Sequence, residues 1–307
     1  MRVGVDIGGT KTEAVAVDAA GSIVAQLRLP TGFGADAVVG STVDVITQLA
    51  ALAGVEARDF ESIGVGIPGA VDTASGRVTH AVNLGLNGLD LGGELTARLG
   101  VPVRVENDVN AAAVGAFHLL GTPGSHSLAY LNLGTGLAAG LVLGGQLWRG
   151  SRGTAGEIGH IPVDPNGPPC SCGQHGCLEM VASGSAVARQ WPTDHPHPVQ
   201  SLFEAADSGD ALAIEVRQRL IDNVASAVRI LVLTVDVDAV VIGGGITSLG
   251  EPLIAMVRAC LDRWADASPF IASLELSRRV DLVPPGFPAA AVGAALVGMS
   301  TEASTAH

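Results

Sequence analysis

Metal-binding residue types are concentrated in one short stretch of this chain. Three of its four cysteines fall within eight residues, and a histidine precedes them by ten. The four residues are His160, Cys170, Cys172 and Cys177. Structural zinc sites take four tetrahedral ligands from Cys and His. Glycines among the cysteines let the backbone turn sharply, and prolines before them exclude a helix. We therefore expect a loop that closes around one zinc ion.

A disulfide between two of these cysteines, with the third left as a free thiol, is the alternative. It requires an oxidising compartment. We expect no secretory signal, because the acid Asp6 interrupts the first apolar run of the chain. The remaining cysteine, Cys260, is expected on a buried helix face.

Two carboxylates flank the cysteine cluster. Glu157 precedes His160 by three residues, and Glu179 follows Cys177 by two. A loop fixed by a metal would hold both acceptors at a set separation, which suits a ligand with several hydroxyl groups. Either glutamate alone would be interpreted as a solvated surface charge, and the rigid setting favours the binding interpretation.

The length and the charge of the chain restrict its partners. A chain of 307 residues predicts two domains. A net charge of −13 without a basic run disfavours nucleic acids and anionic membranes, because phosphate neutralisation dominates those affinities. No apolar stretch is expected to reach the roughly 18 residues of a membrane span. We expect a cytoplasmic protein that binds neither nucleic acid nor membrane.

Strand and helix patterns alternate along the chain, which predicts an α/β sheet covered by helices. Strands are expected at Arg2–Asp6, Lys11–Asp18, Ser22–Leu29, Ser62–Ile67, Val101–Val105, Leu128–Leu133, Leu137–Leu143, Ala239–Ile242 and Val280–Val283. Helices are expected at Asp36–Ala53, Leu89–Leu99, Val109–Leu120, Ser183–Gln190, Leu202–Leu233 with a break near Gly209, Leu249–Trp264 and Ala289–Met299. The strand-turn-strand plan of Val3–Val17 returns at Leu128–Leu143, which indicates two similar α/β domains with a cleft between them.

The first turn has the composition of a phosphate site. It contains Asp6, Gly8, Gly9, Thr10 and Lys11, the only lysine of the chain. Adjacent glycines let backbone N–H groups approach an anion, Thr10 adds a hydroxyl, and Asp6 is placed to hold a hydrated Mg²⁺. An ordinary glycine-rich hairpin is the alternative.

Two further glycine turns strengthen this interpretation. Gly134, Thr135 and Gly136 form a matching turn, so two domains could hold the phosphates of one nucleotide. A third turn of Gly243, Gly244 and Gly245 follows an apolar strand and suits the flat face of a nucleoside. No segment has the spacing of a P-loop.

A further acid follows the strand Val101–Val105. Asp108 lies where a helix is expected to begin, and aspartate is a good helix N-cap. It also lies at the carboxyl end of a strand, where α/β folds bind ligands, so it could act as a general base. The sequence pattern leaves both interpretations open.

Taken together, these motifs resemble a sugar kinase of the ROK family, within the actin-like, hexokinase-type ATPase superfamily. The similarity covers nearly the whole chain. Its motifs are Asp6–Lys11, Glu106–Ala112, Leu133–Gly136, Gly156–His160 and Cys170–Glu179. The resemblance implies two actin-like (ribonuclease H-like) α/β domains, an interdomain cleft and a zinc-binding loop. We place the domains at residues 1–118 with 288–307, where the C-terminal helix returns, and at 119–287.

The resemblance also implies roles for single residues. Asp108 would be the catalytic base, and Mg²⁺ would accompany ATP. His160 would ligate zinc and face the sugar, so the metal would shape the pocket without catalysing. The sugar contacts implied are Gly69, Asn83, Asn107, Glu157, His160 and Glu179. Members of this family are commonly dimers or tetramers, so we expect a homodimer or homotetramer.

Two positions depart from the family pattern. The second phosphate turn is usually followed by more glycine, and here Ala138 and Ala139 follow it. Their methyl groups could narrow the approach to the nucleotide. Leu86 stands where an aromatic residue often follows the Asn83-Leu84 pair by two.

The resemblance implies an enzyme that transfers the γ-phosphoryl group of ATP to the 6-hydroxyl of glucose or N-acetylglucosamine. N-acetylmannosamine or another hexose is the alternative acceptor. The same family contains sugar-responsive repressors with an added DNA-binding segment, which we do not expect here because the first strand begins at Arg2. A sugar-binding protein without catalytic activity is disfavoured, since Asp108 and Lys11 are both present.

Overall fold

A computed structural model describes residues 1–120 and 126–299 of the chain. It contains two compact units, one formed by Met1–Gly121 with Pro288–His307 and the other by Thr122–Phe287. Each unit contains a five-stranded sheet with helices packed on it, so the α/β fold expected from the sequence is confirmed. Residues 300–307 of the expected C-terminal return lie outside the described residues.

The sheet of the first unit has the strand order β3-β2-β1-β4-β8. Its strands are β1 (Arg2–Ile7), β2 (Lys11–Val17), β3 (Ile23–Pro30), β4 (Ser62–Ile67) and β8 (Val103–Asn107). β1, β4 and β8 are parallel, whereas β1 pairs with β2 in an antiparallel hairpin. Consequently the carboxyl ends of β1, β4 and β8 lie at one edge of the sheet.

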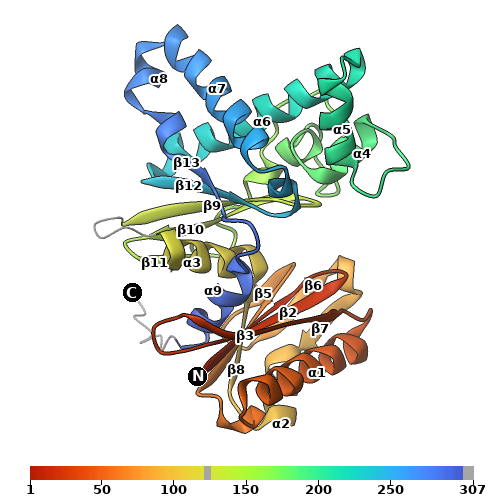
Figure 1. Cartoon of the computed structure of the whole chain (residues 1–307), viewed down its shortest axis with the longest axis vertical. Coiled ribbons are helices and arrows are strands. Elements are labelled where there is room, and N and C mark those ends of the chain that lie inside the picture. The colour runs from red at the N-terminus through yellow and green to blue at the C-terminus, as the bar shows by residue number, and fades with distance from the viewer. Residues whose placement is uncertain (121–125, 300–307) are drawn as a thin grey trace. The chain divides into compact units, whose positions relative to one another are not determined.

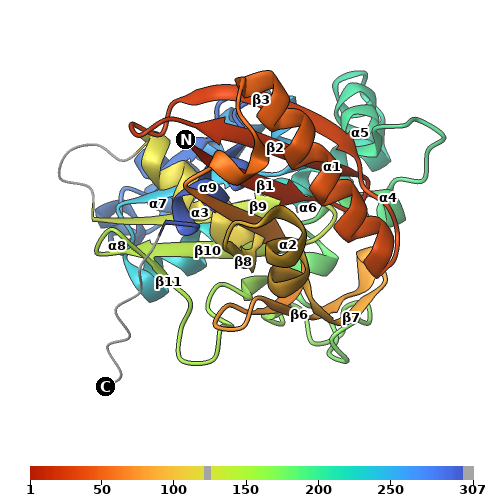
Figure 2. The ribbon, with the colours of Figure 1, turned by 90° about the horizontal axis from the view of Figure 1, so that it is seen from below.

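Helix α1 (Ala35–Ala53) covers this sheet and runs beside β2 and β3 (Figure 2). It is long and apolar enough to cross a membrane by length and composition, which corrects the expectation that no stretch reaches that length. Its residues Val45, Ile46 and Leu49 are fully buried in the core that includes the strands. The apolar face of α1 is therefore used by the core of this unit.

Three other helices belong to the first unit: α2 (Leu91–Leu99), α3 (Asp108–Leu120) and α9 (Ala289–Val297). α3 packs tightly on α9, and α9 packs on β1 and β4. A methyl group on Gly115 would overlap the carbonyl oxygen of Ala289, and one on Gly4 would overlap that of Ala291. These glycines permit backbone-to-backbone packing, which fixes α3 against the sheet.

A small antiparallel sheet was not expected from the sequence. It consists of β5 (Ala70–Asp72), β6 (Arg77–Ala81) and β7 (Leu86–Asp90). The helix expected from Leu89 begins only at Leu91, because β7 continues to Asp90. The Asp90 carboxylate then accepts a hydrogen bond of 3.0 Å from the Gly93 N–H and caps α2.

The second unit has the strand order β11-β10-β9-β12-β13. Its strands are β9 (Ser127–Leu133), β10 (Leu137–Leu143), β11 (Gln146–Trp148), β12 (Ala239–Gly243) and β13 (Val280–Leu282). Its helices are α4 (Gly184–Gln190), α5 (Pro198–Asp207), α6 (Ala211–Val235), α7 (Glu251–Ala267) and α8 (Pro269–Ser273). Helices α6 and α7 cover one face of this sheet (Figure 1).

The repeat expected between the two halves is visible in the pairing. In each sheet an antiparallel hairpin, β1-β2 or β9-β10, is joined to a parallel neighbour, β4 or β12. The glycine turns at residues 8–10 and 134–136 connect the two strands of these hairpins. The internal similarity noted in the sequence therefore corresponds to equivalent strand-turn-strand units.

Candidate active site

The first glycine turn is held in a tight hairpin. The Gly8 N–H donates to the Lys11 carbonyl oxygen at 2.9 Å, and the Thr31 N–H donates to the Thr10 carbonyl oxygen at 3.0 Å. A methyl on Gly8 would lie 2.9 Å from the Lys11 oxygen, too close for a side chain. Gly9, Thr10 and Lys11 are exposed, so their N–H and hydroxyl groups can meet a ligand.

Asp6 and Asp108 approach one another at the carboxyl edge of the parallel strands. Asp6 pairs in register with Gly66, and Gly66 pairs with Glu106. A methyl on Gly66 would lie 3.5 Å from the Asp108 Cα, so glycine leaves room for the start of α3. Burial, and then repulsion from Asp108 and Glu13, raises the pKa of Asp6 to about 7. A carboxylate that ionises with difficulty beside another acid suits a site completed by a cation.

Asn107 caps helix α3, and Asp108 is its first residue. The Asn107 Oδ1 accepts hydrogen bonds from the N–H groups of Val109, at 2.9 Å, and Asn110, at 3.1 Å. The capping role that the sequence left open for Asp108 is therefore filled by its neighbour. As the first helical residue, Asp108 lies at the positive end of the helix, where negative charge is stabilised.

Glu106 is a residue whose role the sequence analysis missed. It is 2% exposed, and its Oε1 accepts from the Asn107 N–H at 2.9 Å and from the Asn110 Nδ2 at 3.0 Å. These bonds tie the last residues of β8 to the first turn of α3. Glu106 thus fixes the backbone on both sides of Asp108. A Glu two residues before Asp and an Asn two after it were the available sequence signal.

Two other expected sugar residues lie near these groups. The Asn107 Nδ2 donates to the Gly69 carbonyl oxygen at 3.1 Å. Gly69 has a φ of 97°, and a methyl there would overlap the His80 carbonyl oxygen, so only glycine fits. Asn83 is exposed on a short 3₁₀ turn, and its Cβ lies 4.0 Å from the position that a Gly9 side chain would take.

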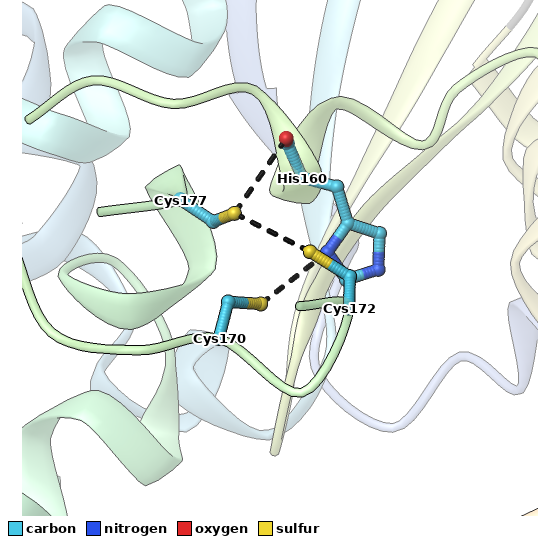
Figure 3. A group of neighbouring side chains, drawn as sticks. All are labelled: His160, Cys170, Cys172 and Cys177. Atoms are coloured by element: carbon cyan, nitrogen blue, oxygen red, sulfur yellow. Dashed lines mark hydrogen bonds between the residues drawn. The ribbon is translucent and has the colours of Figure 1, made fainter. Parts of the chain in front are cut away.

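In the second unit, the four expected metal ligands come together. The ligand atoms of His160, Cys170, Cys172 and Cys177 all lie within 4.8 Å of one another (Figure 3). The Cys170 Sγ is 3.6 Å from the His160 Nδ1, and the Cys172 Sγ is 3.7 Å from the Cys177 Sγ. Zn–S bonds of about 2.3 Å and Zn–N bonds of about 2.0 Å place ligand atoms of a tetrahedron about 3.6–3.8 Å apart. The geometry therefore fits one tetrahedral ion.

The disulfide alternative does not fit this geometry. All four cysteines are free, and a bonded pair would have its sulfurs about 2 Å apart. Hydrogen bonds from the Gln174 backbone and side chain lower the pKa of Cys172 to about 6, whereas burial raises the pKa of Cys177 to about 12. A bound cation would favour the thiolate form of Cys177, whose pKa burial raises.

The His160 ring faces the sulfurs on one edge and the Glu157 carboxylate on the other. His160 turns Nδ1 toward the sulfurs, and its Nε2 is 3.9 Å from the Glu157 Oε2. The Gln174 side chain donates to the His160 carbonyl oxygen at 3.1 Å and braces the loop. Glu157 and the Nε2 edge of His160 therefore form one surface that can accept and donate hydrogen bonds.

Glu179 contacts the second glycine turn. Its Oε2 accepts a hydrogen bond of 2.9 Å from the Leu137 N–H, at the start of β10. The same oxygen would collide with any side chain on Gly136. On the other side of the turn, the Gly184 N–H donates to the Gly134 carbonyl oxygen at 2.8 Å. The turn is thus fixed from both sides.

The two alanines that depart from the family pattern have different surroundings. Ala139 is 3% exposed and belongs to the core with Leu137 and Leu141. Its methyl therefore points into the core and does not narrow the approach to the turn. Ala138 lies on the opposite face of β10 and is half-buried.

A pocket of about 500 Å³ adjoins the second turn. It is walled by glycine turns, by α4, by the loop before α5 and by the start of α5. Its residues are Gly134, Thr135, Gly184, Ser185, Ala188, Pro196, His197, Pro198, Val199, Gln200, Gly245, Ile246 and Ser248. The lining has no acidic side chain and mixes apolar groups with hydroxyls. The sequence analysis named Gly134, Thr135 and Gly245 of this lining, but not Gly184 or the segment 196–200, which no local pattern marks as a binding segment.

The third glycine turn packs closely on its neighbours. A methyl on Gly243 would overlap the ring of Tyr130, and Gly244 has a φ of 88° and lies against the end of β9 at Leu133. Of the three glycines predicted for a nucleoside, only Gly245 lines the pocket.

Residues 2–297 match the ROK family. The glucokinase of Halalkalibacterium halodurans is 34% identical over 292 residues, 87% of this chain and 88% of that protein. The N-acetylmannosamine kinase of Pasteurella multocida is 30% identical, covering 84% and 85%. A ROK family glucokinase from Streptomyces griseus, solved with glucose and AMPPNP, has a TM-score of 0.81 at 31% identity and covers 97% of this chain and 98% of that one.

Proposed function

Because the chain belongs to the ROK family, we propose that it is an ATP-dependent sugar kinase acting on the 6-hydroxyl of an aldohexose, either glucose or N-acetylglucosamine. The observation that carries the proposal is the position of Asp108, at the first turn of α3 beside Asp6 and the first glycine turn. A hydroxyl base next to a cation and phosphate site is the arrangement that phosphoryl transfer needs.

Asp108 is the general base of this proposal. It accepts the proton of the sugar 6-hydroxyl, while the hydroxyl oxygen forms a bond to the γ-phosphorus and the bond to the ADP oxygen breaks. Asp6 would hold Mg²⁺ with the nucleotide, which balances its charge beside Asp108. Gly8, Gly9, Thr10 and Lys11 bind phosphate from the first unit.

We propose further nucleotide contacts within the second unit. The turn of Gly134, Thr135 and Gly136 binds phosphate, and the adjoining pocket of about 500 Å³ receives the nucleoside. Its apolar groups, among them Ile246, suit a flat base, and its lack of acidic residues suits a polyanion. Polyphosphate is the alternative donor.

We propose that the sugar hydroxyls contact the residues that the resemblance implies. Asn83, Asn107 and the Gly69 backbone lie in the first unit, and Glu157, His160 and Glu179 in the second. We propose that the cysteine cluster holds zinc through His160, Cys170, Cys172 and Cys177, and that zinc supplies rigidity to the loop and takes no part in the chemistry.

The acceptor sugar is the open part of the proposal. Relatives of similar identity are named glucokinase and N-acetylmannosamine kinase, so N-acetylmannosamine remains the alternative acceptor. We further propose a cytoplasmic homodimer or homotetramer, which light scattering would test.

A sugar panel tests the function. Purified protein with Mg²⁺-ATP should release ADP with at least one of glucose, N-acetylglucosamine and N-acetylmannosamine, and the product should carry phosphate on the 6-oxygen. Absence of ADP release with every hexose would overturn the kinase proposal, and retention on DNA at physiological salt would favour a regulator.

A further inference from the structure

One carboxylate of the candidate sugar site also holds the second phosphate turn. Glu179 lies three residues from Gly176 and two from Cys177, on a short 3₁₀ turn of Leu178–Met180. From the sequence it was expected to contact only the sugar. Its Oε2 instead accepts the Leu137 N–H at 2.9 Å, across a separation of 42 residues in the chain.

Other hydrogen bonds also hold the turn that Glu179 contacts. The Gly134 N–H donates to the Gly136 carbonyl oxygen at 3.1 Å, which closes the turn itself. The carbonyl oxygens of Gly134 and Thr135 accept N–H groups from the start of α4, at 2.8 and 3.2 Å. The Leu137 N–H is satisfied by Glu179, so the direction of the turn depends on that carboxylate.

The loop that carries the metal cluster fixes the position of Glu179. Cys177 is a member of the metal cluster, and Leu178 is fully buried in the core. The Leu178 N–H donates to the Ile161 carbonyl oxygen at 2.9 Å. A methyl on Gly159 would overlap the Leu137 carbonyl oxygen, so the segment before the cluster also packs on the start of β10. The cluster loop, the Glu179 carboxylate and the second glycine turn are therefore in continuous contact.

We propose that Glu179 is a positioning residue that couples sugar binding to donor binding, a role that rests on the proposed kinase function. One oxygen, Oε2, holds the phosphate turn through Leu137, and the other oxygen accepts a sugar hydroxyl. When a sugar hydroxyl binds the Glu179 carboxylate, it also changes the hydrogen bond from the Leu137 N–H, which orients the second glycine turn. Each ligand therefore changes the affinity of the other by an equal factor, as linkage requires.

Glu157 provides the matched control. It lies on the same loop and on the proposed sugar surface, and its carboxylate approaches the His160 Nε2 at 3.9 Å. The hydrogen bonds of the second turn are made by other residues. Glu157→Ala should weaken sugar binding and leave the coupling intact, whereas Glu179→Ala should weaken sugar binding and also remove the coupling.

Isothermal titration of the zinc-loaded protein measures the coupling, with glucose or N-acetylglucosamine added in the presence and absence of Mg²⁺-AMPPNP. We expect the wild type and Glu157→Ala to bind sugar about tenfold more tightly with AMPPNP, within the usual range of coupling between sites. Glu179→Ala should show no change on adding AMPPNP. Glu179→Gln should keep most of the coupling, because its amide oxygen still accepts the Leu137 N–H.

Amide hydrogen exchange at Leu137 is a second readout that does not depend on activity. Exchange should be slow in the wild type and in Glu179→Gln and at least tenfold faster in Glu179→Ala at equal zinc content. Coupling retained in Glu179→Ala, or unchanged Leu137 exchange, would overturn the inference. A wild type that releases ADP with no hexose would overturn the proposed function instead, so the two failures are distinguishable.

Discussion

The protonation of Asp6 should make the stability of this protein depend on pH in a specific direction. Burial and the nearby Asp108 raise its pKa from 3.8 to about 7. Between these two values the folded chain binds a proton that the unfolded chain releases. The stabilisation of the folded state by this Asp6 proton is therefore fully present below pH 3.8 and is lost as pH rises through about 7.

The magnitude follows from that window. Each pH unit between the two pKa values lowers the free energy of unfolding by about 1.4 kcal/mol, so the loss from pH 5 to pH 8 is about 3 kcal/mol. Asp6→Asn cannot ionise and should lack this loss. Its stability relative to the wild type should rise by about 3 kcal/mol over the same range.

Urea unfolding at pH 5, 6, 7 and 8, in buffer without Mg²⁺ or nucleotide, measures this difference. Subtracting the free energy of unfolding of Asp6→Asn from that of the wild type cancels the contributions of titrating groups that both proteins share. Asp44→Asn, on the exposed face of α1, is the control and should differ from the wild type by a constant amount. A constant difference for Asp6→Asn as well would refute the reasoning.

Three further substitutions test other parts of the account. Asp108→Asn should lower kcat by about 10²–10⁴-fold with sugar affinity nearly unchanged; stopped assays and calorimetry measure both, and activity near that of the wild type would exclude the base. Cys172→Ser should lose zinc and sugar affinity together, while Cys260→Ser, outside the cluster, keeps both in metal analysis and calorimetry. Gly243→Ala should destabilise the second unit by about 1–3 kcal/mol because its methyl overlaps the Tyr130 ring, and unchanged thermal unfolding would contradict that packing.

The parts predictable from the sequence depend on residue type and on strand direction. The cysteine cluster was predicted because Cys and His are the ligands of zinc and their spacing allows a closed loop. Asp6 and Asp108 were each placed at the end of a strand, and parallel strands bring such ends to one edge. The α/β class followed from the same alternation of strands and helices.

Other parts depend on contacts that the sequence pattern does not show. The bond from Glu179 to Leu137 requires the register of β10 against a turn 42 residues away. The strands β5–β7 are three to five residues long, too short for a clear alternation. The close packing of Gly243 on Tyr130 and of Gly244 on Leu133 likewise depends on the fold and is not visible in the sequence.

The cap of α3 shows why two physical interpretations of one residue can be separated only by coordinates. Asp and Asn are equally good N-caps, and the chain has Asn107 and Asp108 in succession. The hydrogen bonds assign the cap to Asn107, and the buried Glu106 holds that choice in place. Asp108 is thereby placed as the first residue of α3, directly after its cap.

The central claim is that the acceptor sugar binds with its 6-hydroxyl on Asp108. A crystal structure with glucose or N-acetylglucosamine and Mg²⁺-AMPPNP tests it most directly. We expect the 6-oxygen about 2.6–3.2 Å from an Asp108 carboxylate oxygen, with ring hydroxyls on Glu157, His160 and Glu179. A sugar bound elsewhere, or one whose 6-oxygen faces away from Asp108, would contradict the account.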